Sequence, residues 1–153
     1  MRLQKNTLLA LYSVLEFAAN PERQLAASEI ARKYRVSPHH LSKVLRTLGR
    51  AKLVGAVRGV GGGYRFTGNA KRLTLMDVIE LFEDISARSA ARPRAARRAG
   101  EPSAAAPFEV DEALGVVLAE VDEIAKATFR SITVATMLKL IERRRQARGV
   151  AEA

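Results

Sequence analysis

Apolar residues recur at helical spacing in the first third of the chain and predict three helices. From Asn6 to Ala19 they mark one face of a first helix. A second, short helix is predicted to begin at Ser28, whose side-chain oxygen can cap it, and to end at Arg35, where the apolar pattern stops. A third helix is predicted from Pro38 to Ala51, because Ser37 suits the N-cap and proline suits the first helical turn.

The third predicted helix has two chemically different faces. Its core face repeats at i, i+3, i+4 and i+7 and consists of Leu41, Val44, Leu45 and Leu48. Its other face carries polar or cationic side chains, namely His39, His40, Ser42, Lys43, Arg46, Thr47 and Arg50.

A hairpin and three further helices are predicted after residue 52. Residues 53–58 and 64–67 are typical of short strands, and they enclose the glycine-rich segment Gly59–Gly63, which can form a tip with positive φ. Thr74 is expected to cap a helix from Leu75 to Asp84. A long amphipathic helix is predicted from Val110 to Arg130, and a shorter one begins near Thr133 and ends in basic residues.

These elements predict a mainly α fold, in which a winged helix-turn-helix domain with a small β-hairpin wing is joined to a long C-terminal dimerisation helix. We expect the DNA-binding domain at residues 1–85 and a flexible Ala/Arg/Pro linker at 86–107. The long helix and a short C-terminal helix are expected within 108–148, followed by a tail at 149–153.

Composition narrows the function classes. The chain of 153 residues contains no cysteine, so it can form neither a disulfide nor a thiolate metal site. No apolar run is long enough to span a membrane, and the first residues do not have the pattern of a signal peptide, so we expect a cytoplasmic protein without a membrane partner.

The net charge of +10 is concentrated at the start of the chain. Residues 1–66 hold 12 Lys and Arg against 3 Asp and Glu, whereas residues 108–153 hold 7 against 8. Charge alone leaves DNA, RNA and an anionic membrane surface open as partners. The absence of any acidic residue between Glu29 and Asp77, together with the polar helix face and the basic hairpin, favours nucleic acid.

In a helix-turn-helix the second helix enters the major groove, which assigns base contacts to His39, His40 and Lys43. Ser37 and Ser42 are expected to donate to phosphates, and Arg46 is expected near the backbone. Arg58 is the candidate for insertion into the minor groove. The full set of predicted DNA-binding residues is Ser28, Ser37, His39, His40, Ser42, Lys43, Arg46, Arg50, Arg58, Gly59, Gly62, Gly63, Tyr64 and Arg65.

Other kinds of site are disfavoured. The glycine cluster is followed by a strand and not by a helix, so it matches neither a dinucleotide fingerprint nor a P-loop. No set of Ser, His and Asp or pair of carboxylates suggests catalysis, and we expect no enzyme activity. Two adjacent histidines with no cysteine and no third ligand nearby do not predict a metal site, so no cofactor is expected.

The apolar stripe of the long helix is wide for a helix that has only a small domain to pack against, and it predicts a homodimer interface. The alternative is a helix that folds back on its own domain. The residues assigned to the dimer interface are Leu114, Val117, Leu118, Val121, Ile124, Ala125 and Phe129.

Residues 1 to about 84 also resemble a known family, the Rrf2-type transcription regulators that include IscR, NsrR and CymR. The resemblance is carried by the wing motif Arg-Gly-x-x-Gly-Gly-Tyr from Arg58 to Tyr64 and by Ala10–Leu11, Ile30–Ala31, Val36–Ser37, Leu41–Leu45, Leu48, Leu53–Val54 and Leu73–Val78. It implies a dimer that binds palindromic operators in double-stranded DNA, and we expect a repressor.

In many members of this family three cysteines after the wing bind an iron-sulfur cluster, and this chain has none of them. The resemblance therefore leaves the signal open. A protein partner could control DNA binding, as in a CymR-like arrangement, a small ligand could bind between the two halves, or sensing could have been lost.

Overall fold

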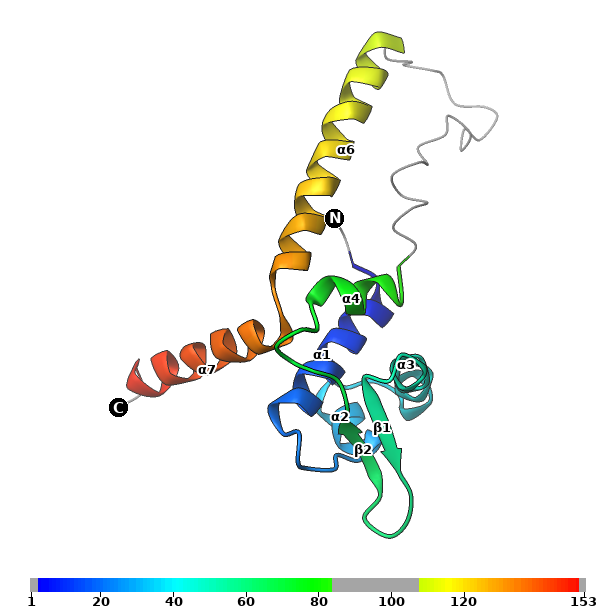
Figure 1. Cartoon of the computed structure of the whole chain (residues 1–153), viewed down its shortest axis with the longest axis vertical. Coiled ribbons are helices and arrows are strands. Elements are labelled where there is room, and N and C mark those ends of the chain that lie inside the picture. The colour runs from blue at the N-terminus through cyan, green and yellow to red at the C-terminus, as the bar shows by residue number, and fades with distance from the viewer. Residues whose placement is uncertain (1–2, 84–107, 152–153) are drawn as a thin grey trace.

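The structure is a computed structural model that describes residues 3–83 and 108–151. The predicted linker at 86–107 therefore lies outside the described residues. The predicted order of helices and strands is confirmed, and so is the mainly helical winged-helix class with a long C-terminal helix. The elements shown in Figure 1 are α1 (Lys5–Ala19), α2 (Ala27–Lys33), α3 (Pro38–Arg50), β1 (Val54–Val57), β2 (Gly63–Phe66), α4 (Leu75–Glu80), α6 (Phe108–Ser131) and α7 (Val134–Ala151).

One hydrophobic core holds the first four helices together. It includes Phe17 of α1, Met76 and Ile79 of α4, and Val134 at the start of α7, each with an exposed fraction of 1% or less. The core face predicted for α3 is confirmed, because all four of its leucine and valine side chains are buried. This packing fixes the direction in which the polar face of α3 points.

The wing is an antiparallel pair in which Val54 lies opposite Phe66 and Val57 opposite Gly63. The chain just before α2 pairs with its second strand, since Leu25 and Tyr64 exchange two backbone hydrogen bonds of 2.9 Å. A Cβ atom on Gly63 would lie 2.6 Å from the Leu25 carbonyl oxygen, so this close approach requires glycine. The wing is thereby anchored beside α2.

This pairing explains why the predicted start of α2 was wrong. The N-cap is Ala26, two residues before the predicted cap Ser28, and no side chain caps the helix. Ser28 instead lies inside the helix and is exposed. The two backbone bonds of Leu25 fix the chain just before this helix start.

The predicted end of α4 also differs. The helix stops at Glu80, and Phe82 lies in a turn. Beyond this turn the buried carboxylate of Glu83 accepts hydrogen bonds of 2.7 Å from the backbone of Gln4 and the hydroxyl of Thr7, which draws the chain toward α1. Asp84, the predicted last residue, lies outside the described residues.

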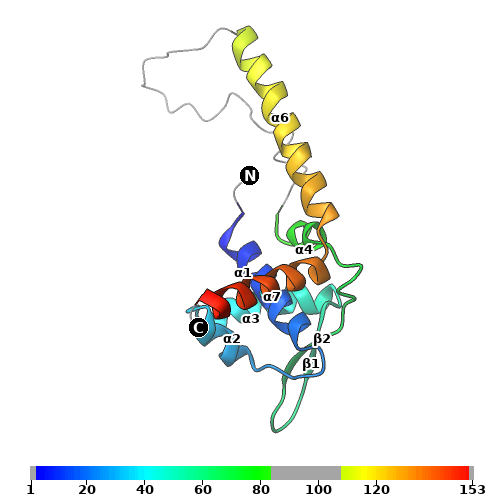
Figure 2. The same ribbon diagram turned by 90° about the vertical axis from the view of Figure 1, so that its left-hand side faces the viewer.

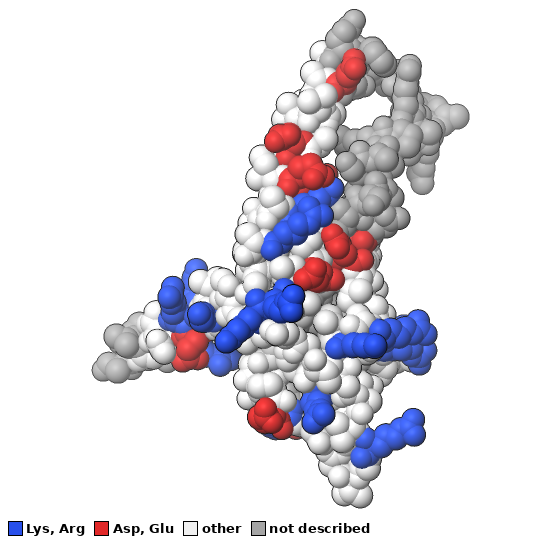
Figure 3. Space-filling model, in the orientation of Figure 1, with Lys and Arg blue, Asp and Glu red and all other residues white. Residues whose placement is uncertain are grey.

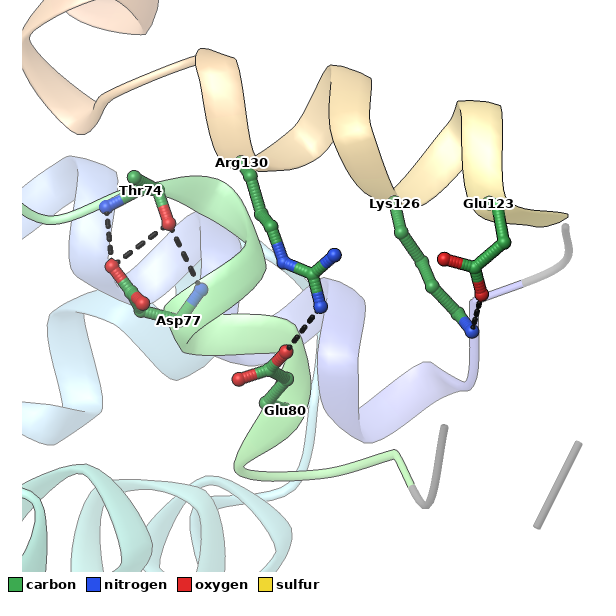
Figure 4. A network of polar contacts seen from close by, with 6 residues as sticks. All are labelled: Thr74, Asp77, Glu80, Glu123, Lys126 and Arg130. Carbon is green, nitrogen blue, oxygen red and sulfur yellow. Dashed lines mark hydrogen bonds and ion pairs between the residues drawn. The ribbon is translucent and has the colours of Figure 1, made fainter. Parts of the chain in front are cut away.

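The C-terminal helices are joined to this body at the segment before α4. The backbone of Leu75 donates to Ile132 at 2.9 Å, and that of Val134 donates to Leu73 at 2.8 Å. The Thr74–Asp77 capping box confirms the predicted cap of α4. Nearby, Arg130 of α6 bonds Glu80, and Lys126 bonds Glu123 on α6 itself (Figure 4).

From this junction α6 projects away from the body (Figure 1), whereas α7 turns and runs across α1, with Val134 buried in the core and Met137 and Leu138 packed against it (Figure 2). The structure has α7 helical through Ala151, so part of the segment predicted as a tail belongs to the helix. None of the helices in the described ranges is long and apolar enough to cross a membrane.

Candidate nucleic-acid interface

The start of α3 is formed as its sequence predicts. The Ser37 side chain accepts a hydrogen bond of 3.2 Å from the backbone N–H of His40, and Pro38 occupies the first turn. Ser37 itself is exposed. The N-terminal end of the helix, with its partial positive charge, is therefore accessible to a phosphate group.

The outer face of α3 is cationic and accessible. His39, Ser42, Lys43, Arg46 and Arg50 are all exposed, as predicted. Basic side chains project from α3 and from the wing on the same side of the molecule, whereas acidic side chains lie along α6 (Figure 3). Such a separation of charge gives one face of the winged-helix body a positive potential.

Two of the predicted contacts on α3 are already engaged within the protein. The Nε2 of His40 donates to the Oδ1 of Asn6 at 2.5 Å, and the imidazole is half-buried. The hydroxyl of Ser42 donates to the Pro38 carbonyl at 2.8 Å and is not free to donate to a phosphate in this arrangement. His39 and Lys43 remain as the accessible side chains near the start of the helix.

The wing presents two arginines beside a tip that only glycine can form. Arg58 follows β1 directly, Arg65 lies in β2, and both side chains are exposed. Gly59 and Gly61 adopt φ values of +112° and +75°, which are strained for other residues. A Cβ atom on Gly62 would lie 2.5 Å from the Val57 carbonyl oxygen. The tip is thus a compact turn that holds Arg58 away from the body.

Tyr64, one of the predicted DNA-binding residues, is half-buried and supports the wing. Its half-buried ring packs against the core and lies 6.3 Å from the ring of Phe17 between centroids. Its backbone N–H and C=O are both bonded to Leu25. The residue therefore holds the wing against α1 and the segment before α2.

Sequence reasoning missed Val60, the residue at the apex of the wing. Its exposed fraction is 111%, the highest among the large hydrophobic side chains in the described ranges. It lies between Gly59 and Gly61, both with positive φ, so the turn leaves its side chain in open solvent. An apolar residue placed inside a glycine run was the available signal, because hairpin tips usually carry polar residues.

The turn between α2 and α3 is supported by a polar cluster on α1. Both Lys33 and Tyr34 donate hydrogen bonds to the Oε1 of Glu16, the latter at 2.6 Å. Burial opposes ionisation of Glu16, but these two bonds outweigh it and hold the pKa of this carboxyl below its usual value. Burial and the bond to Glu16 raise the pKa of Tyr34. Tyr34 also stacks on Tyr12 with a centroid distance of 4.9 Å.

The apolar face of α6 is largely uncovered. Leu114, Val117, Leu118, Val121 and Ile124 have exposed fractions between 46% and 59%. The last two residues of the predicted interface differ from them, since Ala125 and Phe129 are half-buried. Phe129 packs against the core of its own chain, because α6 joins the body at this end.

Three comparisons place this arrangement among known proteins. The family profile described as "Rrf2: Iron-dependent Transcriptional regulator" matches residues 3–140. The chain is 50% identical over 151 residues to BadM of Rhodopseudomonas palustris, which carries the name of an HTH-type transcriptional regulator, and the match covers 97% of this chain and 90% of BadM. Protein aau3 of Rhizobium meliloti is 45% identical over 84 residues, which is 55% of this chain and 54% of that protein.

Solved structures share the fold. CymR, named the global cysteine regulator of B. subtilis, is 21% identical, with a TM-score of 0.68 and coverage of 92% of this chain and 98% of that chain. IscR of T. potens is 22% identical, with a TM-score of 0.64 and coverage of 94% and 90%. At these identities the likeness concerns architecture alone.

The iron named in the family description does not fit this chain as a thiolate-bound centre. The sequence holds no cysteine, and its two histidines, His39 and His40, are adjacent on α3. Within the described ranges, no group of three or more His, Asp or Glu side chains is arranged to hold a metal ion. The donor atoms that iron-sulfur clusters require are therefore missing from the sequence itself.

Proposed function

Because the chain belongs to the Rrf2 family of transcriptional regulators, we propose that it is a homodimeric repressor that binds a palindromic operator in double-stranded DNA. The observation that carries the proposal is the exposed cationic face of α3 lying beside a wing with two exposed arginines. Both belong to a segment without a single acidic side chain between Glu29 and Asp77. Phosphate neutralisation by such a surface supplies affinity for any duplex.

Sequence preference is assigned to the side chains that can reach base edges. His39 and Lys43 are exposed near the start of α3, which is the part of a recognition helix that meets the bases. Arg46 and Arg50 follow about one and two turns later, at positions suited to the backbone. Arg58 is assigned to the minor groove, where arginine is favoured if the groove is narrow. Ser37 is assigned to a phosphate.

The homodimer is proposed from α6. Its exposed apolar side chains are too many for an isolated surface helix and suit a second copy of the same helix. A two-fold dimer places two copies of α3 about one DNA turn apart, so the half-sites are expected about 10 base pairs apart between their centres. Control by a partner protein stays a prediction that nothing in the described contacts favours.

The test is selection of bound duplexes from a random pool by the full chain. We expect a palindrome with a fixed half-site spacing. The selected duplex should lose about 10³-fold or more in affinity between about 50 and 200 mM salt if six or more phosphates are contacted. A duplex of the same length and composition with scrambled half-sites is the matched control. Equal binding of both duplexes at every salt concentration would contradict sequence-specific regulation.

A further inference from the structure

A cleft of about 730 Å³ lies between the DNA-reading half of the chain and its last helix. Its walls come from α1, from the end of α2 and from α7, so it joins segments that are more than 100 residues apart in the sequence. Its volume is within the range of about 300–1,000 Å³ that small-molecule sites occupy.

One side of the cleft is apolar. Met137, Leu138 and Ile141 line it from α7, all half-buried, and Leu15 faces them from α1. Tyr12 adds an aromatic ring that stacks on Tyr34 and remains 42% exposed. A ligand with an apolar body can bury its surface here.

The carboxylates of the cleft already have partners. Glu16 accepts hydrogen bonds from both Lys33 and Tyr34. Glu142 accepts one of 3.1 Å from Gln146 on the next turn of α7. Of the two acids, Glu16 is paired with the cation of Lys33, whereas Glu142 accepts only from a neutral amide.

Arg145 differs from these groups. This exposed residue lines the cleft, yet it forms no hydrogen bond or ion pair with any residue in the described part of the chain. Its charge is felt by Glu16, whose pKa it helps to lower. Among the basic residues that line the cleft, Lys33 is paired with Glu16 and Arg145 is the one left without a partner among the described residues. A guanidinium fork suits a carboxylate particularly well.

We infer that this cleft is a binding site for a small organic acid, whose carboxylate pairs with Arg145 and whose apolar body lies between α1 and α7. The site is distinct from the DNA-binding surface and does not depend on it. Its α2 wall ends at Tyr34, three residues before Ser37, the N-cap of α3. A bound acid would therefore contact the helix pair that positions the recognition helix.

The test is calorimetric titration of the full chain, without DNA, using octanoate as the probe. Octylamine has the same alkyl chain with the opposite charge, and acetate has the same charge without the chain. We expect saturable binding of one octanoate per chain, with octylamine and acetate at least about tenfold weaker. Amide and methyl NMR shifts should localise the bound octanoate to Tyr12, Leu138 and their neighbours.

A matched pair of variants on α7 separates this site from general attraction to a basic helix. Arg145→Gln should weaken octanoate binding at least about tenfold, because the pairing charge is lost. Arg144→Gln removes the same charge one residue earlier, at an exposed position outside the cleft, and should change binding by less than about twofold. Thermal unfolding of both variants checks that each is folded.

The inference is overturned if octanoate gives no saturable heat up to about 5 mM, if octylamine binds equally well, or if the two arginine variants behave alike. None of these outcomes bears on the proposed DNA binding, which the selection of bound duplexes tests independently.

Discussion

The hydroxyl of Tyr34 donates a hydrogen bond of 2.6 Å to the Oε1 of Glu16, which ties the end of α2 to α1 at the turn that leads into α3. The same oxygen accepts from Lys33, so one carboxylate holds both residues at the end of the first helix of the helix-turn-helix. Glu16 therefore ties the end of α2, and with it the turn before α3, to α1.

Replacing this carboxylate tests the relationship. Glu16→Gln keeps the shape but removes the charge, and we expect the free energy of unfolding at neutral pH to fall by about 1–2 kcal/mol. The control is Glu22→Gln, the same change at an exposed glutamate, which should change the free energy of unfolding by less than about 0.5 kcal/mol. Chemical denaturation of the three proteins measures the differences.

The stability difference between wild type and Glu16→Gln is expected to depend on pH. Because the fold lowers the pKa of Glu16 below 4.5, its contribution is fully present above that value and is lost as the pH falls through the lower, folded-state pKa. The difference in stability between wild type and Glu16→Gln should therefore shrink on acidification below about pH 4.5. A constant difference down to the acid transition would mean that the charge of Glu16 is not responsible.

Arg58→Ala tests the wing. Loss of a minor-groove contact should weaken operator binding by about 1–3 kcal/mol and relax the base preference under the wing. Arg144→Ala, which removes an exposed arginine from α7, is the control and should leave the preference unchanged. Binding curves on the selected duplex and on duplexes altered only in the wing subsite measure both effects. If Arg58→Ala leaves affinity and preference intact, the wing does not contact DNA as assigned.

Val60→Thr tests the apolar tip of the same wing. The two side chains have nearly the same shape, but the hydroxyl must lose water where the valine does not. If the fully exposed Val60 packs against the walls of the groove, Val60→Thr should weaken binding by about 1 kcal/mol while the slope of affinity against salt stays the same. Val60→Ile retains an apolar tip and should bind at least as well as wild type. Equal binding by the threonine and isoleucine variants would show that the tip is not in contact.

Local patterns were sufficient to predict the elements whose stabilising contacts are close in sequence. The cap of α3 joins Ser37 to His40, and its buried face repeats within three turns. The glycine run of the wing likewise predicted a turn, and Gly59 and Gly61 adopt the positive φ that glycine favours. These features place the candidate DNA-binding surface.

The errors arose where the partner of a residue is distant in the sequence. Ser28 was expected as a cap, but the helix starts after Ala26, where the chain pairs with the distant Tyr64. His40 is engaged by Asn6, on a different helix. The cleft beside Arg145 could not be foreseen either, since it exists only because α7 returns to α1. No local spacing encodes such contacts.

Charge placed on the apolar face of α6 tests the proposed dimer. Val117 and Val121 are 58% and 51% exposed and one helical turn apart. In a two-fold interface each meets the same surface of the second copy, so Val117→Asp/Val121→Asp would bring four like charges together in an apolar setting. We expect the dissociation constant of the dimer to rise at least about 100-fold, which sedimentation equilibrium measures.

The control for this variant lies on the same helix. Val116 is 67% exposed. Because a helix turns by about 100° per residue, Val116 points away from the apolar stripe that contains Val117 and Val121. Val116→Asp should therefore leave the dimer intact. Because palindromic binding requires two recognition helices held together, the double variant should bind a full operator no better than a single half-site. A double variant that stays dimeric would assign the interface to another surface, and the exposed face of α6 would then need a different occupant.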